Sequence, residues 1–201
     1  MTRSLIVAAL GICLVPSAWP GEIVLFDNLQ NGYGGGFWQI SAEQSVANPF
    51  ESTGTGWLSE VRLALHPIDT RSQGPVFYHV SITNAVAGLP GPAVLYEWTN
   101  VQGAGLNVLT FESRVPVHAG GSYFVKVAPV NDWMVGEWAL NLAGDYGPMA
   151  FSSMGRWYMY ESLRGAMTVK AITEDSVPAV PGPAAAIPFA LGLLARRRCR
   201  R

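Results

Sequence analysis

Hydrophobic residues between Glu22 and Ile172 recur at every second position, in short runs that Gly, Pro and Asn interrupt. This spacing is the period of a β-strand with one buried face, whereas a surface helix repeats its apolar residues every three or four positions. The runs are Val61–Leu65, Val76–Ile82, Tyr123–Val127, Trp138–Leu142 and Met167–Val169, with further runs at Ile23–Phe26, Ala93–Trp98, Leu106–Phe111 and Trp157–Tyr160. We expect an all-β domain over residues 22–173 with roughly nine to eleven strands, arranged as a jelly-roll-type two-sheet β-sandwich.

The first 21 residues have the layout of a secretory signal peptide. Arg3 supplies a positive charge, Leu5–Val15 is apolar, and Pro16–Ala18 forms a small-residue region where a signal peptidase would cut. The apolar stretch is too short to span a bilayer stably as a helix. We therefore expect residues 1–21 to form a signal helix that directs export, and the exact cleavage site stays open by a few residues.

The C-terminal segment, residues 180–201, has three parts in a fixed order. It consists of Val180, Pro181, Gly182 and Pro183, then the apolar residues Ala184–Ala195, then the arginines Arg196, Arg197, Arg198, Arg200 and Arg201. With Val180–Pro183 included, the apolar part comes close to the lower limit of about 17 residues for a membrane span. By the positive-inside rule the arginines stay in the cytoplasm and the rest of the protein lies outside. A short hydrophobic helix is expected here, and residues 174–179 are expected to be a linker.

The charge between these two ends differs from that of the whole chain. All 14 acidic residues lie between Glu22 and Asp175, whereas Arg3 and five terminal arginines take six of the 13 basic residues out of that range. Seven basic against 14 acidic residues give residues 22–175, the domain with the first two linker residues, a charge of −7, although the whole chain carries −1. An acidic domain offers no basic face to phosphates, which argues against nucleic-acid binding.

Both cysteines also lie in the ends, Cys13 in the signal peptide and Cys199 in the arginine tail. The domain therefore has no disulfide, no thiol nucleophile and no cysteine metal ligand. The three histidines, His66, His79 and His118, form no spaced pair of the kind that binds a metal. No cofactor is expected, and a structural Ca²⁺ ion is left open at the loop residues Asp27, Asn28, Asp69, and Asp132 or Asp145.

No motif predicts a catalytic centre. The serines lack the GxSxG elbow, and the carboxylates are scattered one or two to a segment. Gly32–Gly36 is followed by Phe37–Ile40 rather than by a helix that would present N–H groups to a phosphate, so we expect a flexible surface loop there. An enzyme remains the alternative, a glycan-active hydrolase on a jelly-roll scaffold, and it requires two carboxylates that face each other across a cleft.

Aromatic residues are the feature that most suggests a ligand. The domain contains Trp38, Trp57, Trp98, Trp133, Trp138, Trp157, Tyr158 and Tyr160. Exposed Trp and Tyr rings stack on sugar rings because they combine an apolar face with a polar edge. Trp98 and Trp138 alternate as core residues do, so the candidate glycan-stacking residues are Trp133, Trp157 and Tyr158.

The C-terminal residues Val180–Pro183, the apolar stretch and the arginine tail resemble the PEP-CTERM sorting signal that exosortases recognise. The departure is Gly182, where the usual motif has glutamate. The resemblance implies processing by an exosortase after export, in an exopolysaccharide-producing Gram-negative bacterium. The protein would be anchored transiently in the inner membrane and end at the cell envelope, on the outer surface or in the extracellular matrix.

The domain is similar to the choice-of-anchor exported domains, on the residues Leu25–Ser41, Gln44–Phe50 and Gly88–Leu95. That family has no assigned activity, so no functional residue follows from the resemblance. The sequence predicts an exported, exosortase-processed surface or matrix protein that is not an enzyme, with exopolysaccharide as its candidate ligand. Its expected processing partners are signal peptidase and exosortase.

Overall fold

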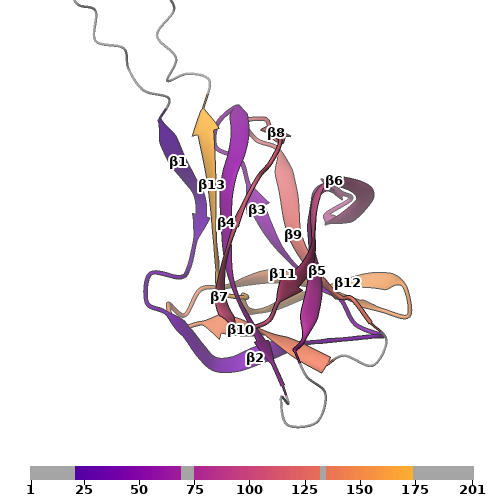
Figure 1. Ribbon diagram of the computed structural model, residues 1–201. Helices are drawn as coiled ribbons and strands as arrows, with labels where there is room; N and C mark the ends of the chain where they lie inside the picture. Colours follow the sequence, from indigo (N-terminus) through magenta and orange to yellow (C-terminus); the bar gives the residue numbers. More distant parts are fainter. Residues whose placement is uncertain (1–20, 69–74, 132–134, 174–201) are drawn as a thin grey trace, which may run out of the picture. The chain divides into compact units, whose positions relative to one another are not determined.

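The alternating runs form antiparallel strands in the computed structural model, which describes residues 21–68, 75–131 and 135–173 (Figure 1). Apart from Gly21, the predicted signal peptide lies outside these ranges, as do the linker, the C-terminal segment, Asp69, Asp132 and Trp133. The strands are β1 (Glu22–Asp27), β2 (Tyr33–Ser41), β3 (Val46–Glu51), β4 (Gly56–Pro67), β5 (Phe77–Val86), β6 (Leu89–Gln102), β7 (Gly105–Thr110), β8 (Pro116–Val117), β9 (Ser122–Pro129), β10 (Val135–Asn141), β11 (Tyr146–Ser153), β12 (Arg156–Leu163) and β13 (Met167–Thr173).

The strands form two antiparallel sheets. The seven-stranded sheet has the order β1-β13-β4-β10-β2, and β7 and β8 also pair with β4. The six-stranded sheet has the order β12-β11-β3-β9-β5-β6. Buried residues of both sheets form one core: Val61, Leu63 and Trp138 come from the seven-stranded sheet, and Val80 and Val125 from the six-stranded sheet. The prediction of an all-β, two-sheet sandwich is confirmed, but the described residues form 13 strands rather than the nine to eleven expected.

The prediction of a flexible loop at Gly32–Gly36 is wrong. Tyr33–Gly36 belong to β2, which pairs with β10 as Tyr33↔Asn141 and Phe37↔Ala139. Three glycines on β2 thus lie opposite one residue on β10, which is a β-bulge. Gly35 has a φ of +72° there, a conformation that glycine adopts without the penalty other residues pay.

The hairpin of β11 and β12 leaves the six-stranded sheet soon after it joins it. Strand β3 pairs with β9 along its whole length, from Val46 to Glu51, but with β11 only at Val46 and Ala47. In Figure 1 the hairpin crosses the lower half of the drawing, whereas β3 and β9 rise above it. Pro49, which has no N–H, lies in the part of β3 that β11 no longer accompanies, as prolines in sheets generally do.

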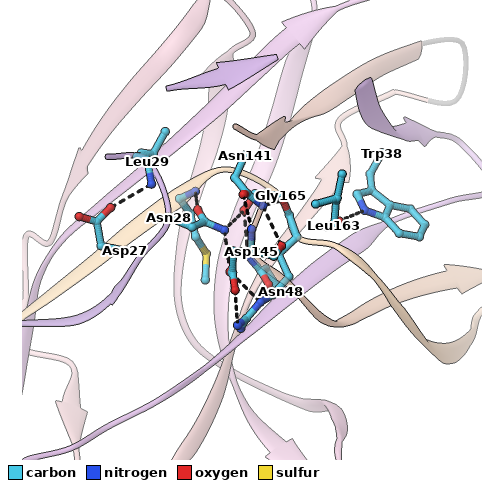
Figure 2. Close-up of polar contacts among 11 residues, drawn as sticks. Asp27, Asn28, Leu29, Trp38, Asn48, Asn141, Asp145, Leu163 and Gly165 are labelled. Carbon is cyan, nitrogen blue, oxygen red and sulfur yellow. Dashed lines mark hydrogen bonds and ion pairs between the residues drawn. The ribbon is translucent and has the colours of Figure 1, made fainter. Parts of the chain in front are cut away.

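Three asparagines connect the strands at the end of the sandwich where β12 turns into β13 (Figure 2). Asn28 and Asn48 both donate from Nδ2 to the carbonyl oxygen of Gly165, at 3.2 and 3.0 Å. Asn28 Oδ1 accepts a hydrogen bond from the Met167 N–H at 2.8 Å. Asn141 donates to the carbonyl oxygens of Arg164 and Asp145. Because buried polar groups are costly unless paired, this network fixes how β1, β3 and β10 meet.

Within the described ranges, no helix is long and apolar enough to cross a membrane.

Candidate functional site

The two predicted glycan-stacking residues on β12, Trp157 and Tyr158, point to opposite faces of the hairpin. Strand β12 pairs with β11 without a register shift, so Trp157 lies opposite Ser152 and Tyr158 opposite Phe151. Adjacent residues in a strand face opposite ways. The structure therefore does not bring this pair together, and Trp133, the third candidate, lies outside the described residues.

Trp157 covers the outer face of the six-stranded sheet. Its ring packs against a buried cluster of Ala47, Phe124 and Ala150, which are all at most 2% exposed. The ammonium group of Lys126 lies 5.9 Å from the centre of the Trp157 ring, which is a cation–π contact. Trp157 is thus held in place by packing and by a cation–π contact, which indicates a structural role for its ring.

Tyr158 lies in a row of aromatic rings on the other face of the hairpin. Its ring stacks on Phe151 with 5.4 Å between centroids and 24° between planes. Tyr160 also contacts Phe151, at 5.2 Å, and Trp38 of β2 stacks on Phe151 at 6.3 Å. We call these four residues the tyrosine face: Trp38, Phe151, Tyr158 and Tyr160.

Trp38 joins the tyrosine face to the sandwich. The Trp38 indole Nε1 donates to the carbonyl oxygen of Leu163 at 3.1 Å, a bond between β2 and the end of β12 (Figure 2). This bond holds the ring at the inner end of the row. The tyrosines lie at the outer end, with Tyr158 44% and Tyr160 56% exposed. A rigid base thus carries two exposed rings.

The hydroxyl groups of Tyr158 and Tyr160 make no hydrogen bond to any described residue. A buried tyrosine hydroxyl usually finds a partner, but an exposed one is free to bind a ligand. The tyrosine face therefore offers two apolar ring surfaces and two free hydroxyls. This combination suits a ring that has both C–H faces and hydroxyl edges.

Sequence reasoning found Tyr158 but missed the residues beside it. Tyr158 and Tyr160 are two positions apart in an alternating strand, and that spacing alone places them on one face. Phe151 and Trp38 carry no comparable signal, because their approach depends on how β11 and β2 meet. Trp138 is fully buried as expected, and Trp98 packs half-buried against the core, donating from Nε1 to the carbonyl oxygen of Thr110.

In the described part of the chain, one cation, Lys170, brings the carboxylates of Glu22 and Glu60 together. Lys170 Nζ lies 3.1 Å from Glu22 Oε2 and 3.3 Å from Glu60 Oε1, and Arg62 Nε contacts Glu60 Oε1 at 2.7 Å. The hydrogen bond from Arg62 is the main reason why the pKa of Glu60 lies below its ordinary value, followed on the same side by that from Lys170 and opposed by burial. These carboxylates are neutralised by cations, which is the arrangement of an ion-pair network.

The candidate calcium ligands on described residues all have protein partners. Asp27 Oδ1 accepts from the Leu29 N–H at 3.0 Å and from Thr168 Oγ1 at 2.8 Å. Asn28 and Asp145 belong to the buried network, and Asp145 pairs with Arg164. Among the described residues, no three His, Cys, Asp or Glu side chains are grouped as a metal site.

A scan of the chain against family models gives no match, and searches of the curated proteins and of the solved structures give none either.

Proposed function

We propose that this protein is an exported, non-catalytic surface or extracellular-matrix protein whose β-sandwich binds exopolysaccharide through the tyrosine face. The observation that carries the proposal is the pair of exposed rings, Tyr158 and Tyr160, on one side of β12 above the stacked rings of Phe151 and Trp38. The scaffold is proposed to be of the jelly-roll type, and its ends to be a signal helix and a short hydrophobic helix.

Sugar recognition follows from the chemistry of the exposed rings. Same-face neighbours in a strand lie about 7 Å apart, so the two tyrosines present separate ring surfaces to a chain of sugar units. Each ring offers an apolar face to the sugar C–H groups and a hydroxyl to the sugar edge. The contact is shallow and open, which suits internal positions of a long polymer better than a small ligand enclosed in a pocket.

The test is retention of the full-length protein on the exopolysaccharide of its own host. Replacing both rings, Tyr158→Ala with Tyr160→Ala, should weaken binding roughly tenfold, since each aromatic contact contributes about 0.5–1.5 kcal/mol. The matched control is Tyr146→Ala. Tyr146 is 65% exposed on the same hairpin but lies on its opposite face, and its hydroxyl donates to the Glu161 carbonyl oxygen. Equal loss in the control, or no retention of the unaltered protein, would contradict the proposal.

The proposed location depends on both ends of the chain. A signal peptidase would remove residues 1–21, and an exosortase would cut near Val180–Pro183 while Arg196–Arg198, Arg200 and Arg201 hold the tail in the cytoplasm. Intact masses of the protein from wild-type and exosortase-deleted cells test this processing. We expect a shorter C-terminus in the wild type, and chains that end at Arg201 in both strains would refute it.

The alternative is a glycan-active hydrolase, and the structure gives it less support. Such an enzyme needs two carboxylates that face the substrate from opposite sides, separated by about 5–10 Å. Glu22 and Glu60, which lie close together, are engaged by Lys170 and Arg62. Release of reducing sugar ends from the host exopolysaccharide would favour the enzyme over the binding protein.

A further inference from the structure

The bulge of β2 leaves a hollow on the outer face of the seven-stranded sheet. Its volume is about 290 Å³, and it is lined by Tyr33–Phe37, His66, Glu137 and Ala139. The three glycines of the bulge supply one wall without side chains. A Cβ atom built at Gly34 would meet nothing within 4 Å, so this part of the wall is open backbone.

Glu137 and His66 face this hollow together from adjacent strands. They are direct partners in the register of β10 and β4, and Trp138, the next residue, points into the core with no exposed surface. Tyr78 of the opposite sheet fixes both backbones from below. Its hydroxyl donates to the His66 carbonyl oxygen at 2.7 Å and accepts from the Glu137 N–H at 3.2 Å.

The carboxylate of Glu137 has no strong counter-charge in the described part of the chain. None of the ion pairs there includes it, and its side-chain oxygens accept no hydrogen bond from a described residue. Burial raises the pKa of this carboxyl, and the neighbouring His66 opposes the rise. A cation that enters the hollow would stabilise the ionised form of this half-buried, unpaired carboxyl group.

Aromatic rings stand around the same hollow. The ring of Tyr33 lies 5.5 Å from the imidazole of His66 at an angle of 45°, and the side chain of Phe37 is 51% exposed. An ammonium group is attracted both to a carboxylate and to aromatic faces. Phosphate, sulfate or uronate groups would be repelled by Glu137 and by the −7 charge of the domain between Glu22 and Asp175.

We propose that this hollow is a second binding site, which takes the ammonium group of an amino sugar in a partly deacetylated polysaccharide. Glu137 binds the ammonium group, and Tyr33 and Phe37 contact the sugar ring that carries it. The inference rests on the proposed function in one respect, that the domain binds polysaccharide. It assigns a different ligand chemistry to a site on the outer face of the seven-stranded sheet, whereas the exposed tyrosines of the tyrosine face lie on β12 of the six-stranded sheet.

The test is titration of the full chain with two probes, an oligomer of glucosamine and an oligomer of N-acetylglucosamine of equal length. The unaltered protein should prefer the glucosamine oligomer, because acetylation removes the positive charge. Glu137→Gln keeps the shape of the side chain and should weaken glucosamine binding at least about tenfold while leaving the acetylated oligomer unaffected. Tyr33→Ala should weaken it as well.

The matched control is Glu112→Gln, which changes the net charge equally at an exposed loop position away from the hollow. A loss as large in Glu112→Gln as in Glu137→Gln would show general attraction to an acidic protein and overturn the site. Equal affinity for both oligomers would overturn the ammonium assignment. The pair Tyr158→Ala and Tyr160→Ala separates the two proposals, since it should reduce exopolysaccharide retention but leave the preference for glucosamine intact. Thermal unfolding of each variant identifies any that fails to fold, and Phe37→Ala then replaces it.

Discussion

Arg164 binds both carboxylate oxygens of Asp145: its Nε lies 2.9 Å from Oδ2, and its Nη2 donates to Oδ1 at 3.0 Å. Asn28 adds a hydrogen bond to the same Oδ2 at 3.2 Å. The guanidinium carbon of Arg164 also lies 4.6 Å from the centre of the Phe26 ring. This one pair therefore connects the start of β11, the turn after β12 and strand β1. The Nη2 contact is a charge-assisted hydrogen bond, whereas the Nε contact is an ion pair that lacks hydrogen-bond geometry.

Asp145→Ala should destabilise the protein by about 2 kcal/mol, because it leaves a mostly buried guanidinium without its partner. The side chains are only 20% (Arg164) and 27% (Asp145) exposed. Urea unfolding measures the loss. The control is Arg62→Ala, whose side chain is 40% exposed and whose removal should cost less than about 1 kcal/mol. A smaller loss for Asp145→Ala than for Arg62→Ala would show that the pair adds no stability.

Stability should fall in acid partly through Glu60. The folded-state pKa of Glu60 lies below its ordinary value of 4.5, mainly because of the hydrogen bond from Arg62. Its contribution is therefore complete above that ordinary value and is lost as the pH falls through the lower, folded-state pKa. Glu60→Gln should lower the free energy of unfolding by about 1 kcal/mol or less at neutral pH. The free energy of unfolding should then fall less steeply as the pH is lowered. Urea midpoints at about pH 7 and pH 3 measure it, and an unchanged slope would contradict this role.

Gly136→Ala should destabilise the protein by about 3 kcal/mol. A Cβ atom at position 136 would overlap the Tyr78 hydroxyl, which joins β4 to β10. The new methyl group must displace that ring or break its two hydrogen bonds. Tyr78→Phe alone should cost about 1–2 kcal/mol. The double variant should cost less than the sum, and strictly additive losses in urea unfolding would show that the two sites are not in contact.

Trp157 and Tyr160 should separate stability from binding. Trp157→Ala uncovers Ala47, Phe124 and Ala150 and should cost about 2 kcal/mol without changing polysaccharide retention at a temperature where the variant is folded. Tyr160→Ala removes a ring that is 56% exposed, so it should cost less than about 1 kcal/mol but weaken retention. Melting temperatures and retention assays on both variants measure the two effects. Lost retention in Trp157→Ala and a large loss of stability in Tyr160→Ala would contradict the prediction.

The alternation of apolar and polar residues predicted the strands that have one buried and one solvent-exposed face. The residues Val61–Leu65 and Tyr123–Val127 fall within β4 and β9, since their period is set locally by the pleat. The glycine bulge of β2 could not be read this way, because Gly34–Gly36 have no side chains to alternate and their pairing with β10 is set by distant residues.

The candidate site was predicted only in part for the same reason. The sequence shows that Trp157 and Tyr158 are adjacent and aromatic, but adjacency in a strand puts them on opposite faces. Which face is covered depends on Phe124 and Ala150, and which is open depends on Phe151 and Trp38. Trp38 and its partners Phe151 and Leu163 lie more than a hundred positions apart in the sequence, so no local pattern predicts their contact.

Pro49 affects whether copies of this protein can associate strand to strand at high density. Within the described residues, the segment Asn48–Glu51 of β3 has no strand partner on the side that β11 leaves, and unpaired edges are where identical molecules join strand to strand. A proline there denies an arriving strand one of the donors it needs, so this segment is a poor template for a strand of another copy. At high density the copies of this chain are thereby kept from joining strand to strand along Asn48–Glu51.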